Sequence, residues 1–206
     1  LKLHYHEQVS HSWIYQYIAK DKAEGGELSN HLRRGGSYQK EPVEYRGKIP
    51  NRISIDQRPE IVTKRTRLGD YEIDLIVGPK NKGAILTIVD RVSRECTIKK
   101  LQSKSALEVE SVVSRAIKGD AYTITSDNGT EFTNHQAIAQ ALNIQYFFAN
   151  PYASYERGSI ENLNGLIRQY IPKGKGFEDI EQNELDLIEN KLNNRPRKVL
   201  AFLSPI

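Results

Sequence analysis

The chain has 206 residues, of which 38% are hydrophobic, and this size suits one globular core together with a smaller appendage. No apolar run approaches the roughly 20 residues of a membrane-spanning helix, and the first residues do not form a signal peptide, so we expect a cytoplasmic protein. The single cysteine, Cys96, excludes an internal disulfide and a cysteine-rich zinc site. Because the sequence contains no methionine, we expect it to be a fragment.

The positive charge is concentrated near the start of the chain. Residues 1–65 hold 12 Lys and Arg against 8 Asp and Glu, which accounts for the whole net charge of +4, and the remaining residues balance. A basic segment of this kind suits an arm that contacts DNA phosphates, with Arg33 and Arg34 as candidate contacts. A solvated linker explains the same charges equally well.

A short amphipathic helix is expected after Ser10, because Trp13 and Tyr17 recur at i, i+4 spacing behind a hydroxyl cap. Such a helix occurs in helix-turn-helix modules, whose partner helix would then lie before residue 1. A helix that serves only in packing is the simpler alternative. Residues 20–65 lack a sustained period and are expected to form a basic connector with one short helix near 27–33.

From residue 68 the hydrophobic pattern becomes regular and predicts the order βββαβαβα, which gives a mixed five-stranded sheet flanked by helices. The first three strands should form a meander, and the first helix should begin with a capping box at Ser105 and Glu108. The expected strands are 70–77, 84–89, 95–101, 122–125 and 144–148, and the expected helices are 105–119, 134–142, 156–170 and a segment around 185–192.

Three acidic residues occupy informative places in this pattern. Asp74 lies in an otherwise apolar alternating strand, Asp127 follows the fourth strand, and Glu161 lies on a helix away from its apolar stripe. Asp127 is also explained as a turn residue before an Asn-Gly pair, and Glu161 as an ordinary exposed glutamate. The first and fourth strands must be neighbours for these carboxylates to meet. Glu72 shares a strand face with Asp74 and is the rival ligand, although we favour an auxiliary or structural role for it.

Carboxylates that meet in this way repel one another, and Mg²⁺ or Mn²⁺ resolves the conflict because these ions prefer oxygen ligands. Two such ions about 3.5–4 Å apart assist the attacking and the leaving oxygen in a phosphodiester displacement. We therefore interpret Asp74, Asp127 and Glu161 as a metal-binding site for phosphoryl transfer on DNA.

Other motifs and residues bear on alternative, auxiliary or DNA-contacting sites. No Gly-x-Ser-x-Gly elbow or phosphate-binding Gly-x-x-x-x-Gly-Lys loop is present. His135 either lies near the site and touches DNA, or it caps or packs a helix. The auxiliary candidates are thus Glu72, Asn128 and His135, and the candidate DNA contacts near the closing helices are Arg157, Asn164, Arg168, Lys173, Arg195 and Arg197.

Four segments, residues 69–78, 126–132, 157–170 and 192–198, carry a resemblance to the DDE transposases of the IS30 family of bacterial insertion sequences. The resemblance covers nearly the whole chain and keeps the order of the motifs. It departs from the family pattern at Tyr71, where tryptophan is frequent, and at Ile73, where glycine is frequent.

This resemblance implies an RNase H-like core of the retroviral-integrase type in residues 66–206, with two divalent metal ions and a catalytic triad at Asp74, Asp127 and Glu161. It also implies that residues 1–65 are a remnant of a helix-turn-helix region with its linker. The implied partners are the terminal inverted repeats of the element, target DNA and further copies of the chain. Two alternatives are an RNase H-like nuclease without strand transfer and a non-catalytic DNA-binding remnant.

Overall fold

The computed structural model describes residues 10–32, 49–151 and 153–205, in two compact units within residues 1–44 and 45–206. The first unit contains helix α2 (His11–Ala23) and a 3₁₀ turn at Leu28–His31. Ser10 caps α2 as expected, because its hydroxyl accepts the backbone N–H of Trp13 at 3.1 Å. The ring of Trp13 stacks on that of Tyr17 with centroids 5.4 Å apart. The helix-turn-helix origin of this unit stays a prediction.

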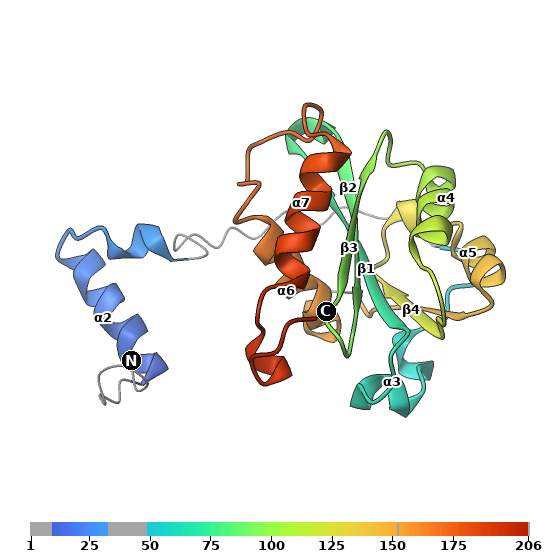
Figure 1. Cartoon of the computed structure of the whole chain (residues 1–206), viewed down its shortest axis with the longest axis horizontal. Coiled ribbons are helices and arrows are strands. Elements are labelled where there is room, and N and C mark those ends of the chain that lie inside the picture. The colour runs from blue at the N-terminus through green and yellow to red at the C-terminus, as the bar shows by residue number, and fades with distance from the viewer. Residues whose placement is uncertain (1–9, 33–48, 152, 206) are drawn as a thin grey trace. The chain divides into compact units, whose positions relative to one another are not determined.

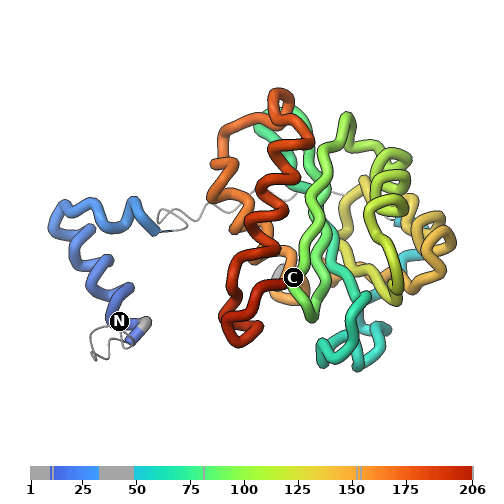
Figure 2. Tube along the Cα trace, in the orientation of Figure 1, coloured from blue at the N-terminus to red at the C-terminus, as the bar shows by residue number. Residues whose placement is uncertain are grey.

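The second unit is built on a five-stranded mixed sheet with the strand order β3-β2-β1-β4-β5. Figures 1 and 2 trace the path of the chain through this unit. The first three strands form the expected antiparallel meander, and β4 and β5 continue the sheet in parallel with β1. The first and fourth strands are therefore neighbours, as the predicted site requires. The strands are β1 (Asp70–Val77), β2 (Ala84–Asp90), β3 (Cys96–Leu101), β4 (Thr123–Ser126) and β5 (Gln145–Phe148).

Helices cover both faces of this sheet, with α4 and α5 on one face and α6 and α7 on the other (Figure 1). Their hydrophobic residues form two cores, one on each side of the sheet. In the described ranges no helix combines the length and apolarity that crossing a membrane requires. The helices of this unit are α3 (Glu60–Lys64), α4 (Ala106–Ala116), α5 (His135–Leu142), α6 (Gly158–Ile167) and α7 (Gln182–Asn193).

The alternation of side chains along β1 decides which face carries the site. Ile73 belongs to the core under α4 and α5, whereas Ile76 belongs to the core under α6 and α7. Because side chains two apart in a strand share a face, Glu72 and Asp74 point to the same side as Ile76. Both acids therefore face α6, the helix that carries Glu161.

Helix α6 is shorter than expected. Residues Ser154–Arg157 form a 3₁₀ turn ahead of it, and the helix ends at Ile167. Tyr170, the last residue of the expected helix, therefore lies beyond α6 and is 38% exposed, whereas Leu166 is buried.

Residues 49–65 pack with the core, although they were predicted to belong to the N-terminal segment. Ile55 and Val62 are buried, and the N–H of Phe148 in β5 donates to the carbonyl of Ile53 at 2.9 Å. Ser54 forms an isolated parallel bridge with Phe148, so this segment extends the sheet beyond β5.

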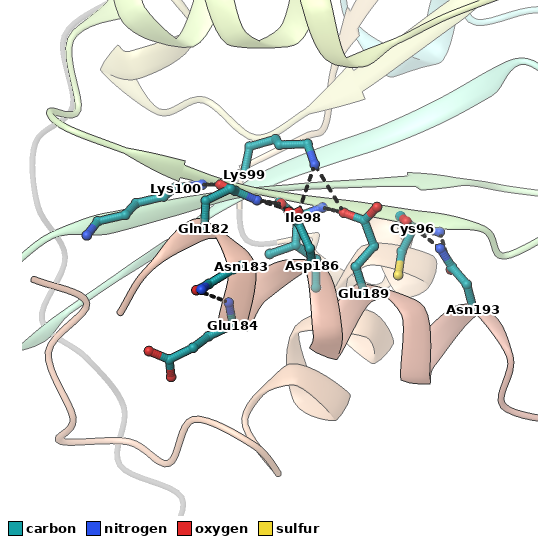
Figure 3. A network of polar contacts seen from close by, with 10 residues as sticks. All are labelled: Cys96, Ile98, Lys99, Lys100, Gln182, Asn183, Glu184, Asp186, Glu189 and Asn193. Carbon is teal, nitrogen blue, oxygen red and sulfur yellow. Dashed lines mark hydrogen bonds and ion pairs between the residues drawn. The ribbon is translucent and has the colours of Figure 1, made fainter. Parts of the chain in front are cut away.

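The free edge of β3 is covered by side chains of α7 (Figure 3). Asn193 pairs with both backbone groups of Cys96, accepting from its N–H and donating to its carbonyl at 2.8 Å each. Glu189 accepts the N–H of Ile98 at 2.7 Å, and Gln182 donates to the carbonyl of the same residue at 3.0 Å. Three side chains of one helix thus occupy positions where another strand would otherwise pair.

Replacing Asn193 with alanine is expected to destabilise the protein by about 2 kcal/mol, because it leaves the buried N–H and carbonyl of Cys96 without partners. Urea denaturation followed by circular dichroism measures this difference. Asn190→Ala is the control, because Asn190 is exposed on the same helix and its side chain bonds to Asn194 instead of the sheet. Equal stability of the two variants would contradict the account of the covered edge.

Candidate active site

Asp74 is held in a fixed orientation by two neutral side chains. It lies opposite Thr87 of β2, and its carboxylate Oδ2 accepts a 2.7 Å hydrogen bond from Nδ2 of Asn164 on α6. The hydroxyl of the fully buried Thr87 donates to Oδ1 of Asn164 at 2.9 Å, which fixes the orientation of the amide. Thr87 was not predicted as part of the site, although a polar residue within the buried apolar strand β2 was the available signal.

Asp127 reaches the same region from the end of β4. Its Oδ1 accepts the N–H of Gly129 at 2.9 Å, so the residue also shapes the turn that follows the strand. Asn128 fixes this turn to the sheet, because its side-chain amide donates to the carbonyl of Ala149 at 2.8 Å. Since β1 and β4 are parallel neighbours, both carboxylates emerge at one side of the sheet.

The guanidinium of Arg157 contacts both aspartates. Its Nη1 lies 3.5 Å from Oδ1 of Asp74, and its Nη2 lies 3.8 Å from Oδ2 of Asp127. The arginine immediately precedes α6 and is 13% exposed. One cation therefore connects the two carboxylates, which shows that they converge within reach of a single positive charge.

The electrostatics of the site leave Asp74 poorly stabilised as an anion. Burial raises its pKa from the ordinary 3.8 to about 6. Arg157 opposes this rise in pKa, whereas the negative charge of Asp127 adds to it. The carboxylate is thus charged above about pH 6, and more positive charge nearby would stabilise it.

Glu161 lies on the exposed side of the first part of α6. It precedes Asn164 by three residues, so the two side chains share one side of the helix, and Asn164 contacts Asp74. Within residues 10–32, 49–151 and 153–205, no group of three or more His, Cys, Asp or Glu side chains is arranged to hold a metal ion. The structure thus brings Asp74 and Asp127 together and places Glu161 one helical turn from a residue that contacts Asp74.

The donor chemistry of the two aspartates fits a divalent cation. Mg²⁺ and Mn²⁺ take carboxylate oxygens as ligands. Asp74 and Asp127 supply such oxygens from neighbouring strands, and they already share a cationic partner in Arg157. Glu161 is the remaining candidate for completing the set.

Replacing Arg157 with glutamine is expected to increase the affinity for Mn²⁺ about fivefold. The guanidinium, whose interaction with the two carboxylates contributes about 1 kcal/mol, then no longer competes with the metal for them. Calorimetric titration at pH 8, where Asp74 is ionised in the parent, measures the change. Arg168→Gln is the control, since its guanidinium bonds to the carbonyl of Val77. Weaker binding in Arg157→Gln than in the control would contradict the competition.

The predicted DNA contacts fall into two groups. Lys173 and Arg195 are exposed, and Arg195 also donates to the side chain of Gln169 at 3.2 Å. Arg168 and Arg197 are partly buried and donate to backbone carbonyls at 3.4 and 2.8 Å. The predicted contacts at Arg33 and Arg34 lie outside the described residues.

His135 is buried at the start of α5, at 3% exposure. Its ring meets Phe148 edge-on with centroids 4.9 Å apart and lies 5.5 Å from the ring of Tyr146. Its two nitrogens face the backbone carbonyls of Thr133 and Asn51 at 3.2 and 3.4 Å. This environment favours the packing alternative for His135.

Comparison with known proteins identifies both the fold and the family. Residues 68–154 match the Integrase core domain family, a range that contains all five strands, Asp74 and Asp127. The catalytic core domain of BIV integrase has a similar fold, with a TM-score of 0.50 at 22% identity over 66% of this chain and 90% of that one. The sheet is therefore that of an RNase H-like integrase core.

Curated transposases are similar over most of the chain. The transposase of insertion sequence element IS4351 from Bacteroides fragilis is 51% identical over 203 residues, which cover 96% of this chain and 62% of that protein. The transposase InsI of element IS30A from Escherichia coli K12 is 35% identical over 86% of this chain. The matched part spans 47% of InsI. The chain belongs to the IS30 family of DDE transposases, and its second unit carries their integrase-type core.

Proposed function

We propose that this chain forms the catalytic part of a transposase, which cleaves DNA at the ends of an insertion sequence and joins the freed 3′-hydroxyl to target DNA. The observation that carries the proposal is the convergence of Asp74 and Asp127, from neighbouring strands, on the guanidinium of Arg157. The family relationship supports transposition as the overall process.

In this proposal Asp74, Asp127 and Glu161 would hold Mg²⁺ or Mn²⁺, with two ions in the complete site. When bound, such ions activate the attacking hydroxyl and neutralise the charge that develops on the leaving oxygen. Asn164 donates a hydrogen bond to Oδ2 of Asp74, whereas Oδ1 faces the guanidinium of Arg157, the cation that both aspartates contact. Glu161 would complete the set from α6, on the side of the helix that also carries Asn164.

Arg157 has two successive partners in this scheme. Without metal its guanidinium balances part of the charge of the two aspartates. With a divalent ion held by the aspartates, the guanidinium would be available to a DNA phosphate, to which a planar bidentate donor is well suited. The exposed Lys173 and Arg195 are proposed to contact phosphates further along the DNA, together with Arg33 and Arg34, and the chain is proposed to act as a homo-oligomer on DNA.

A joining assay tests this function. The purified chain is incubated with Mn²⁺, supercoiled plasmid and a labelled duplex oligonucleotide that has a free 3′-hydroxyl. The parent is expected to transfer label to the plasmid and Glu161→Gln to lose this product. Glu178→Gln should behave as the parent, because Glu178 is exposed on a loop and pairs with Lys82.

Three results of the joining assay would contradict the proposal. Nicked plasmid without transferred label favours an RNase H-like nuclease. Bound DNA without either product favours a non-catalytic DNA-binding protein. Label transfer that persists in Glu161→Gln removes that residue from the site.

A further inference from the structure

The first turn of α6 is capped by the sheet instead of by its own preceding residue. The first N–H groups of a helix have no partner within it, and here the N-cap residue, Arg157, supplies no side-chain hydrogen bond. The N–H of Ile160, in the first turn, instead donates to Oε2 of Glu72 at 2.8 Å. A carboxylate from β1 thus caps α6, and its negative charge suits the positive end of the helix.

Glu72 is fixed in this position by a buried arginine. Its side chain is fully buried, and its other oxygen, Oε1, pairs with Nη1 of Arg91, which is 3% exposed. Arg91 is in turn anchored because its Nε donates to the carbonyl of Val62 at 3.2 Å. Both carboxylate oxygens of Glu72 are therefore engaged inside the protein, which favours a positioning role over a ligand role.

The residue next to Ile160 is held in the same way. Ser159 is buried, and its hydroxyl accepts a hydrogen bond from Arg94, which lies on the turn between β2 and β3. The two residues immediately before Glu161 are therefore each bonded to the sheet or to one of its turns. Since Glu161 follows them directly in the helix, its backbone position depends on these bonds.

We infer that Glu72 is a positioning residue, whose buried carboxylate caps α6 through Ile160 and thereby sets the place of Glu161 relative to Asp74. Glu72 and Asp74 are two residues apart on one face of β1. The same segment of β1 therefore carries Asp74, a candidate metal ligand, and holds α6, the helix that carries Glu161. The part of this inference that concerns Glu161 rests on the proposed function.

Glu72→Gln tests the inference, because the amide that replaces one oxygen turns a donor toward either Ile160 or Arg91, both of which are donors. Hydrogen exchange of residues 158–163 in the metal-free protein is expected to become about tenfold faster relative to α7. In the joining assay kcat is expected to fall about 100-fold, with KM for DNA within about twofold of the parent, because misplaced groups slow chemistry more than binding.

Two further variants keep the result interpretable. Glu72→Asp retains the buried charge, but its shorter side chain does not reach both Arg91 and Ile160. The same changes in exchange and in kcat are therefore expected for this variant, and it serves as the test if Glu72→Gln does not fold. Asp70→Asn is the matched control. Asp70 is buried on the same strand and pairs with an arginine, Arg67, at 2.8 Å, but its other side-chain partner is Thr123 on β4. It should lower overall stability without selective exchange in α6.

Two results would overturn the inference. Either the exchange rate in α6 is unchanged by Glu72→Asp, or it increases only as much as the loss of global stability accounts for, as in Asp70→Asn. The exchange measurement needs neither metal nor DNA. A parent chain without joining activity would therefore refute the proposed function while the exchange result still decides whether Glu72 holds α6.

Discussion

Replacing Asp74 with asparagine is expected to lower the rate of DNA joining about 1,000-fold or more. The substitution removes one of the two carboxylates that converge on the guanidinium of Arg157 and that are proposed to hold the metal. Divalent ions contribute several kcal/mol of transition-state stabilisation, and about 4 kcal/mol corresponds to a 1,000-fold change in rate. Initial rates of label transfer to plasmid, at saturating DNA and Mn²⁺, measure the loss.

Asp120→Asn is the control for this substitution, because Asp120 is exposed before β4, whereas the site lies beyond the other end of that strand. It is expected to retain the parental rate. A joining rate of Asp74→Asn within about tenfold of the parent would show that the chemistry does not depend on this carboxylate.

The same substitution is expected to stabilise the metal-free protein by about 2 kcal/mol at pH 8 and to have little effect on stability at pH 4. The pKa of Asp74 is about 6 in the folded protein and 3.8 ordinarily, so the folded state binds this proton more tightly than the unfolded state. The contribution of this group to the free energy of unfolding is therefore fully present below about pH 4 and is lost as the pH rises through about 6. Asparagine does not titrate and avoids that loss.

Urea denaturation of the parent and Asp74→Asn in EDTA, at pH 4 and at pH 8, measures this effect. The expected difference of about 2 kcal/mol is smaller than the free energy that corresponds to the full pKa shift, because the Asp74 side chain is 22% exposed and partly screened by water. A difference in unfolding free energy that is the same at both pH values would contradict the burial of the charge.

The sheet and the meeting of its two aspartates were predictable from local patterns. Apolar alternation and turn residues marked all five strands within one or two residues, and Asp74 stood out as a charge in an apolar strand. Once β1 and β4 are neighbours, Asp74 and Asp127 must emerge near one another. This part of the site depends only on the order, direction and register of two strands, which is why local sequence patterns went far toward predicting it.

The contacts that hold α6 were not predictable in the same way. Arg91 and Arg94 lie in a turn, where arginines are usually solvated, and yet they bond to Glu72 and Ser159 inside the protein. Their partners are 19 and 65 residues away in sequence, so no local period reveals them. Likewise, Asn193 looked like an ordinary residue at a helix end, and its pairing with the edge of β3 requires the folded arrangement.

Titration of Mn²⁺ into the metal-free parent, Asp127→Asn and Asp120→Asn tests the central claim that Asp74 and Asp127 together form a metal site. The parent and Asp120→Asn are expected to bind with equal affinity, and Asp127→Asn at least about tenfold more weakly, because it loses an oxygen ligand that carries charge. Equal Mn²⁺ affinity in all three proteins, with DNA absent and with DNA present, would contradict the claim.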